Sequence, residues 1–152
     1  MSEKITNPQT LAGETLVAYL DTDYWVERVP AAESFALRVG EPCAPMRQLT
    51  NSSRAKGAAF ITAYNPLGIA TGESANKQAQ AALAARLAGC AREVLSGEGR
   101  GRIGDWPPEP SWLALGIDFD DACQLGRAFG QNAIIWVGSD YTPALVILRR
   151  GF

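Results

Sequence analysis

Alternating and continuous runs of apolar residues predict seven strands along the chain. From Thr15 the segment TLVAYLDTDYWV alternates and is rich in β-branched and aromatic residues, which predicts a strand that bends near Asp21. Residues 34–39 form a second candidate. Ala58 to Tyr64 is apolar almost throughout and predicts a central strand covered on both faces. The other strands are expected at residues 91–95, 111–117, 133–137 and 144–148, with the last two joined as a hairpin.

Two amphipathic segments with clear end signals predict the main helices. The first begins at Ser74, repeats Ala and Leu on one face every fourth residue, and ends at Gly89. The second begins after Asp118, a good N-cap residue, and ends at Gly130. Residues 40–56 hold several Pro, Asn and Ser residues, so we expect a loop there with one short helix around residues 46–49.

The predicted order of elements is βββ-α-ββ-α-ββ. It describes an α+β fold in which a mixed sheet carries helices against one face. With 152 residues the chain is long enough for one hydrophobic core and too short for two ordinary domains. We therefore expect a flexible tail at residues 1–11 and a single domain at residues 12–152, with an irregular glycine-rich loop after Leu95.

Composition narrows the class of protein. A content of 47% hydrophobic and 20% charged residues is typical of a soluble globular protein, and a net charge of −2 argues against a nucleic-acid partner. No apolar run is long enough to cross a membrane, and the polar start resembles no signal peptide. Three widely spaced cysteines then favour reduced thiols in the cytoplasm. The chain has no histidine, which excludes imidazole catalysis and His-dependent zinc sites, and we expect no cofactor or metal.

Neutral amides at strand ends are the first candidates for a binding site. Asn65 follows the apolar strand at an Asn-Pro stop, and Gln131 and Asn132 precede the strand at residues 133–137. Amides both donate and accept hydrogen bonds, so this set, with Asn76, suits recognition of a base, an amide or a sugar better than bond breaking. The alternative is that Asn65 satisfies its own turn and the other amides cap the end of a helix.

Glu109 is the strongest candidate for catalysis. It lies between Pro108 and Pro110 and close to Trp106 in the sequence, and an apolar wall of this kind raises the pKa of a carboxyl group. Glu98 would then serve as the second carboxylate. The alternative is that Glu109 accepts backbone N–H groups and fixes the loop.

Two further patterns have structural explanations. The glycines at positions 99, 101 and 104 match the spacing of a dinucleotide-binding loop, but proline-rich sequence follows where that site needs a helix, which favours a loop. The three aspartates at positions 118, 120 and 121 are explained by helix capping rather than by a bound cation.

Four features along the chain occur together in one known family. They are ITAYNP at residues 61–66, Asn76, the pattern W-x-x-E-x-S at residues 106–111, and FGQNA at residues 129–133. From about Thr15 to about Leu148 the chain thus resembles domain-of-unknown-function family number 3293, a bacterial family of small cytoplasmic proteins. The resemblance implies no reaction. It selects as the positions to test Asn65, Asn76, Glu109, Ser111, Gln131 and Asn132.

Three functions follow as hypotheses. The first is a module that binds a small polar or nucleotide-like ligand at the sheet ends, through the amides, Trp106 and Ser111, with stacking or shielding by Tyr64. The second is a His-free hydrolase or transferase that uses Glu109 and Glu98 as acid and base. The third is a protein-interaction domain that works as a homodimer through a patch of exposed tryptophans, namely Trp25, Trp112 and Trp136.

Overall fold

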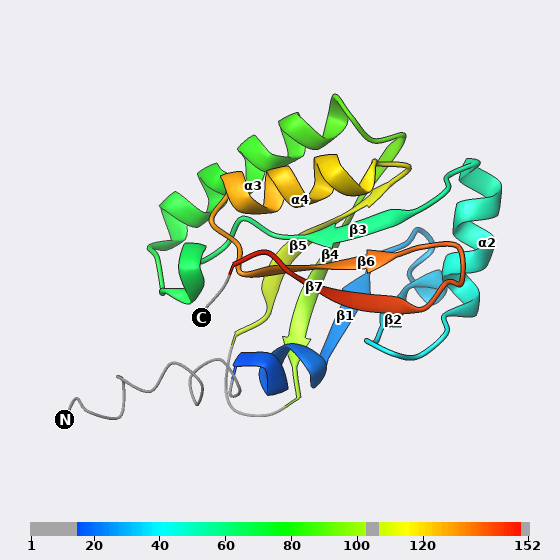
Figure 1. Cartoon of the computed structure of the whole chain (residues 1–152), viewed down its shortest axis with the longest axis horizontal. Coiled ribbons are helices and arrows are strands. Elements are labelled where there is room, and N and C mark those ends of the chain that lie inside the picture. The colour runs from blue at the N-terminus through cyan, green and yellow to red at the C-terminus, as the bar shows by residue number, and fades with distance from the viewer. Residues whose placement is uncertain (1–14, 103–106, 150–152) are drawn as a thin grey trace.

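A computed structural model describes residues 15–102 and 107–149, and its strands form one seven-stranded sheet in which every neighbouring pair is antiparallel (Figure 1). The strands lie in the order β2-β1-β4-β5-β3-β6-β7. Their bounds are β1 Thr22–Val26, β2 Phe35–Leu37, β3 Ala58–Ile61, β4 Glu93–Gly101, β5 Glu109–Leu115, β6 Ala133–Val137 and β7 Pro143–Ile147. The α+β class is therefore confirmed, whereas the expectation of a mixed sheet is wrong.

In the described parts of the chain, three long helices and a short N-terminal one pack around the sheet. The long helices are α2 Ala44–Ser53, α3 Glu73–Ala88 and α4 Phe119–Ala128, and two 3-10 turns are η2 Ala31–Glu33 and η3 Pro66–Gly68. Residues 15–20 are also helical, and we call them the N-terminal helix. The predicted count of two main helices is thus too low, and the predicted elements differ from the structure at three places. The predicted tail, residues 1–11, lies outside the described residues.

The first difference is the N-terminal helix, where a strand was expected to begin at Thr15. In this short segment apolar residues fit either a two-residue or a four-residue period. The structure shows the four-residue period of a helix. Thr15 and Tyr19, four residues apart, face inward, whereas Leu16, Val17 and Leu20 are exposed. The strand itself starts at Thr22.

The second difference is β4, which runs through the stretch expected to be an irregular loop. Glycine is disfavoured in strands, so the composition argued against one. Here a glycine is required, since a Cβ atom at Gly97 would collide with the carbonyl oxygen of Trp25 on the neighbouring strand β1.

The third difference is α2, which is longer than the short helix expected at residues 46–49. Pro45 lies in its first turn, where a missing N–H costs nothing, so the proline that suggested a loop is compatible with the helix. Met46, Leu49 and Thr50 are buried against the sheet.

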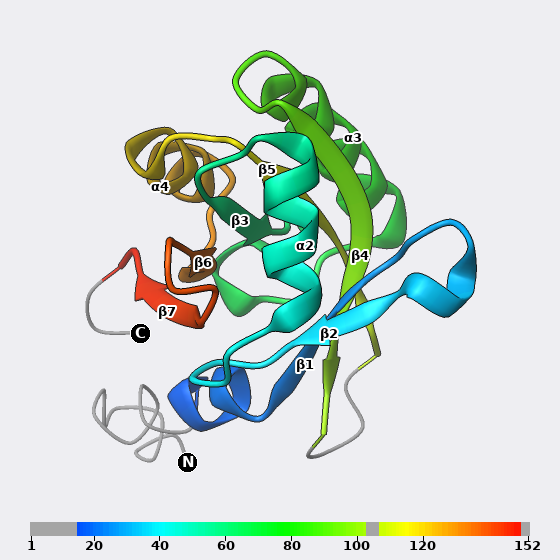
Figure 2. The same ribbon diagram turned by 90° about the vertical axis from the view of Figure 1, so that its right-hand side faces the viewer.

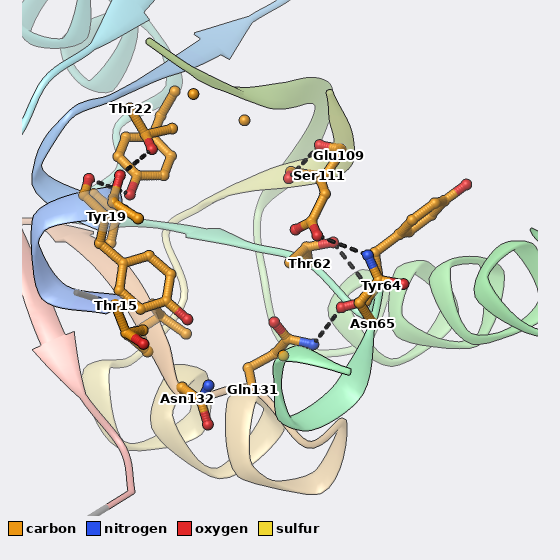
Figure 3. Close-up of a pocket in the computed structure, with 18 of the residues that line it drawn as sticks. Thr15, Tyr19, Thr22, Thr62, Tyr64, Asn65, Glu109, Ser111, Gln131 and Asn132 are labelled. Carbon is orange, nitrogen blue, oxygen red and sulfur yellow. Dashed lines mark hydrogen bonds between the residues drawn. The ribbon is translucent and has the colours of Figure 1, made fainter. Parts of the chain in front are cut away.

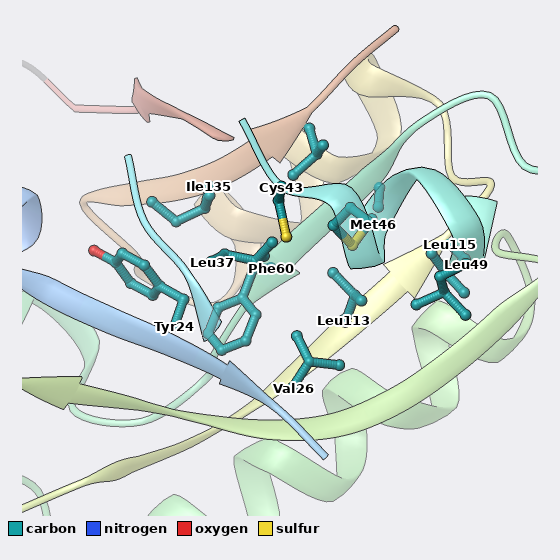
Figure 4. Close-up of a cluster of buried hydrophobic side chains, with 12 residues drawn as sticks. Tyr24, Val26, Leu37, Cys43, Met46, Leu49, Phe60, Leu113, Leu115 and Ile135 are labelled. Atoms are coloured by element: carbon teal, nitrogen blue, oxygen red, sulfur yellow. The ribbon is translucent and has the colours of Figure 1, made fainter. Parts of the chain in front are cut away.

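The curled sheet has two covered faces, although helices were expected on one face alone. The inner face packs on α2 and carries Phe60, Leu113 and Leu115 (Figures 2 and 4). The outer face packs on α3 and α4 through the residues between them, such as Ile61 and Ala114. Strand β3 lies between β5 and β6 and is buried along its whole length, which confirms the predicted central strand.

The local end signals gave the remaining elements correctly. Helix α4 begins after Asp118 and is followed by Gly130 in a left-handed conformation, and β6 and β7 pair as the predicted hairpin. Within the described part of the chain, no helix has both the length and the apolar character needed to cross a bilayer.

Candidate functional site

The inner face of the sheet is filled by α2 at one end and holds a pocket at the other. The pocket has a volume of about 610 Å³, which is within the range of sites for small molecules. Strand residues form its floor. Its walls come from the N-terminal helix, from residues 65–69 after β3 and from residues 131 and 132 before β6 (Figure 3).

Strand β5 places Glu109 and Ser111 on the pocket floor. Alternate residues of a strand face the same side, so these two share the inner face with Leu113 and Leu115. Glu109 is paired across the sheet with Gly99 of β4. A Cβ atom at Gly99 would meet nothing closer than 3.8 Å, so the absent side chain leaves open space beside the Glu109 carboxylate.

Asn65 is held in a left-handed conformation, with a φ of 48°, and its amide is fully oriented. Its Oδ1 accepts hydrogen bonds from Thr71 N at 3.0 Å and from Asn76 Nδ2 at 2.9 Å, and its backbone N–H donates to Asn76 Oδ1 at 3.0 Å. The remaining group, Nδ2, donates to Glu109 Oε2 at 2.9 Å. Asn76 therefore positions Asn65, and Asn65 positions Glu109.

The Asn-Pro turn docks on the segment that follows α4. Leu67 N donates to the Gly130 carbonyl at 2.7 Å, and Gly130 has a φ of +72°. A Cβ atom there would lie 2.8 Å from Pro66 Cβ, so both the conformation and the close contact require glycine. Gln131 completes the junction by donating from Nε2 to the Tyr64 carbonyl at 3.1 Å.

Gln131 therefore uses its N–H groups on backbone carbonyls, since Nε2 also donates to Phe129 O at 3.3 Å. Carbonyls can only accept, which fixes the orientation of the side-chain amide. Its oxygen points into the pocket (Figure 3).

The N-terminal helix is joined to the pocket by two tyrosines. Tyr24 Oη donates to the Tyr19 carbonyl at 2.7 Å, and the Tyr19 phenol hydrogen-bonds to the Asn132 side chain. Asn132 Oδ1 accepts from Arg149 Nη1 at 2.6 Å. Burial raises the pKa of Tyr19, and the bond with Asn132 offsets part of that shift. Sequence reasoning missed Tyr19 because a strand was expected there.

Glu109 is the charged group on the floor. Burial raises the pKa of its carboxyl group above the ordinary value, and the hydrogen bond from Asn65 partly opposes this. Among the described residues, Asn65 is the only side chain that donates to this carboxylate. The other acid of the lining, Asp21, lies 4.0 Å from Arg102, and no described Lys or Arg lines the pocket. The charged side chains of the described lining are therefore both acidic.

The structure brings together most of the predicted site residues. Those that line the pocket are Asn65, Glu109, Ser111, Gln131 and Asn132. Asn76 lies behind them as the support of Asn65, and Trp106 lies outside the described residues. Tyr64 is also part of the lining, but its ring points away from the pocket (Figure 3), so the expected stacking by this residue lacks the required geometry.

The predicted pair of Glu98 and Glu109 does not share a site. Glu98 is paired with Pro110, one position from Glu109, and successive residues of a strand face opposite sides of the sheet. Its carboxylate forms an ion pair with Arg100 on the outer face. An acid and base acting together from these two residues would need them on one face.

The three tryptophans do not form a shared exposed patch. Each is half-buried. They are covered in different ways: the Arg100 guanidinium stacks 4.6 Å from the Trp25 ring, Trp112 Nε1 donates to the Gln80 carbonyl at 3.0 Å, and Trp136 packs edge-to-face on Phe119 at 5.2 Å.

The acidic and thiol groups elsewhere have structural surroundings. Among the described residues, no cluster of three His, Cys, Asp or Glu side chains has the spacing to hold a metal ion. Asp118 occupies the N-cap position of α4 without a side-chain capping bond. The three cysteines, all in the described part of the chain, are free thiols.

Comparison with known proteins finds one family to which part of the chain is similar. No curated protein and no solved structure matches it at a significant level. Residues 61–134, just under half of the chain, match the family described as "Protein of unknown function (DUF3293)". This segment contains all the pocket residues predicted from the sequence, whereas the N-terminal helix precedes it. Over residues 61–134, the chain is therefore similar to the family DUF3293.

Proposed function

We propose that the protein is a binding module whose inner-face pocket takes a small polar or nucleotide-like ligand. The observation that carries the proposal is the environment of the Glu109 carboxylate. Its carboxylate is partly desolvated, receives one side-chain hydrogen bond from the described residues, and faces a hollow of about 610 Å³. A carboxylate kept this way costs stability unless something pairs with it, and a ligand is the partner that the hollow admits.

The arrangement around Glu109 supports binding over a purely structural role. A carboxylate that fixes a loop accepts backbone N–H groups, as the alternative interpretation requires. In the described residues the bond to Glu109 comes instead from the side chain of Asn65, which is itself held by Asn76 and Thr71. Asn65, Asn76 and Thr71 thus hold the Glu109 carboxylate in a fixed orientation toward the pocket.

Asn65 is a poor position for a first test, because its Oδ1 holds the loop through Thr71 and Asn76. Gly99 is better. Gly99→Ala adds a methyl group inside the pocket, whose nearest neighbours would be Thr22 Cγ2 at 3.8 Å and Tyr24 Cδ1 at 4.0 Å, so the fold accommodates it. Gly72→Ala is the matched control, since nothing lies within 4 Å of that Cβ atom and Gly72 is outside the pocket lining.

The experiment is a thermal-shift screen of the parent protein against small polar metabolites, including nucleosides and nucleobases. A ligand that binds the folded state raises Tm with increasing concentration. Gly99→Ala should weaken that ligand by about 10- to 100-fold, as one misplaced methyl group does in a fitted pocket, while Gly72→Ala leaves it unchanged. A ligand that is indifferent to Gly99→Ala binds elsewhere and contradicts the proposal.

A further inference from the structure

We infer that the ligand is a small organic cation, an amine or a guanidine, whose N–H groups donate to Glu109 and Gln131. The inference rests on the proposed binding function and narrows its ligand class. It depends on three properties of the pocket lining: which hydrogen-bonding groups are left unused, the sign of the charge, and the rings on the floor.

The polar wall of the pocket accepts hydrogen bonds and has few donors left to offer. Three of its side-chain donors already serve the protein's own carbonyl groups. These bonds run from Ser111 Oγ to Glu109 O (3.0 Å), from Thr62 Oγ1 to Pro110 O (2.7 Å) and from Gln131 Nε2 to Tyr64 O (3.1 Å). Thr62 Oγ1 also accepts from Tyr64 N at 3.0 Å, which leaves its own proton for Pro110.

The acceptors that remain are directed at the ligand. Gln131 presents its amide oxygen to the pocket, and Glu109 presents the carboxylate oxygen that Asn65 does not bind (Figure 3). A group with several N–H donors satisfies both, whereas a ligand that offers only acceptors faces oxygen atoms.

The charges of the pocket lining also favour a cationic ligand. Glu109 and Asp21 line the pocket, and no described Lys or Arg does. Two cations lie near the lining without being part of it: Arg149 donates to the neutral amide of Asn132, and Arg102 lies near Asp21 and Asp23. A phosphate or carboxylate in this hollow would lack a cationic partner from the described lining, so a nucleotide would place at most its base there.

The apolar part of the pocket suits the body of such a cation. Tyr24 and Phe60 lie on the floor, with their ring centroids 5.3 Å apart in an edge-to-face arrangement, and Tyr19 stands at the wall. The face of an aromatic ring attracts a cation, and it also packs well against an alkyl chain. The pocket thus combines a carboxylate with aromatic surface, the chemistry by which proteins hold organic ammonium and guanidinium groups.

The test uses three probes with one ring and three charges: tyramine as the amine, tyrosol as the neutral alcohol and 4-hydroxyphenylacetate as the anion. Agmatine is added as a guanidine. Binding is measured by calorimetry and by Tm shift. We expect the cations to bind, with the anion about tenfold weaker than tyramine or worse, because like charges in a partly desolvated site repel.

Two variants carry the same chemical change on opposite faces of the sheet. Glu109→Gln removes the charge on the pocket floor and should weaken the cations about 30-fold or more. Glu98→Gln removes a charge on the outer face and should leave binding unchanged. Below the pKa of Glu109 the parent should also lose affinity, and the other titratable groups facing this carboxylate are Asp21 of the lining and the phenols of Tyr19 and Tyr24.

The outcomes separate the inference from the proposed function. If tyrosol or the anion binds better than tyramine, or if Glu109→Gln binds the cations as well as the parent, the inference is overturned while pocket binding stands. Failure of every cation overturns it too. If the probes bind but Gly99→Ala has no effect on them, binding is outside the pocket and both proposals fail.

Discussion

The two ends of the inner face are built from the same strands and differ in what covers them. Along β5 the inward residues change from Glu109 and Ser111 at the pocket end to Leu113 and Leu115 at the α2 end. At the α2 end the side chains are fully buried against Met46 and its neighbours. At the pocket end the N-terminal helix leaves a hollow. One sheet face thus forms part of the hydrophobic core at one end and the floor of a pocket at the other.

The pocket end of the inner face is where the fold keeps a group that does not favour its stability. Positive φ at non-glycine residues does not distinguish the two ends, because it occurs at Asn65 and Leu67 beside the pocket and at Arg54 and Tyr141 beside α2. The pocket end differs in holding the partly desolvated carboxylate of Glu109, and carboxyl groups with a shifted pKa are concentrated at sites of function. The α2 end has ordinary apolar packing, so its residues are explained by the fold alone.

The largest predicted effect is a difference in the free energy of unfolding between substitutions at two positions of β5. Leu113→Ala removes a fully buried side chain at the α2 end and should lower the free energy of unfolding by about 2–5 kcal/mol. Ser111→Ala, two residues earlier at the pocket end, loses one hydrogen bond and should cost about 0.5–1.5 kcal/mol. Urea denaturation measures both, and equal losses would remove the contrast between the two ends.

Gly130→Ala should break the junction that shapes the pocket wall. The substitution forces a Cβ atom into a left-handed conformation and to 2.8 Å from Pro66, with an expected loss of about 1–3 kcal/mol. Gly72→Ala is again the control, with open space around its Cβ atom. Chemical denaturation of both variants would show the junction to be dispensable if Gly130→Ala were as stable as the control.

Asn65→Asp tests the bond that aims Glu109. The aspartate keeps an oxygen for Thr71 and Asn76 but replaces the N–H donor to Glu109 with a second carboxylate, so the loss should be about 1–3 kcal/mol at neutral pH. A neighbouring acid raises the pKa of Glu109 further, and protonation relieves the repulsion. The loss should therefore shrink as the pH falls, and a loss that is independent of pH would show that the bond is unimportant.

Much of the fold was readable from local signals. Helix α4 and the β6–β7 hairpin have their own caps and turns, so residues far away do not decide them. Strand β4 and the N-terminal helix depend instead on contacts with residues far away in the sequence. In β4, Gly97 is needed because the Trp25 carbonyl lies against it. In the N-terminal helix, Tyr19 faces inward, where its phenol hydrogen-bonds to Asn132. Such contacts exist only after the sheet has formed.

The site was readable to a similar extent. Asn65, Gln131 and Glu109 stand out as polar residues at the ends of apolar strands. The choice between Glu98 and Glu109 needed the pairing register, because a shift of one residue moves a side chain to the other face. Thr62 gave no signal, since its place on the floor depends on its bond to Pro110.

The smallest predicted effect concerns Glu109→Gln. Burial raises the pKa of Glu109 in the folded protein, so the folded state favours the protonated acid. The contribution of this group to stability is then fully present below its ordinary pKa and is lost as the pH rises through the folded pKa. Glutamine keeps an oxygen that accepts from Asn65 and carries no charge.

The most direct measurement is the free energy of unfolding of Glu109→Gln and of the parent at pH 7 and at pH 4. If the carboxylate is kept for a ligand, the variant is more stable than the parent at pH 7, and the gain diminishes toward pH 4. If the carboxylate instead pins the fold, the variant loses about 1 kcal/mol or more at pH 7. That loss would contradict a pocket maintained for binding.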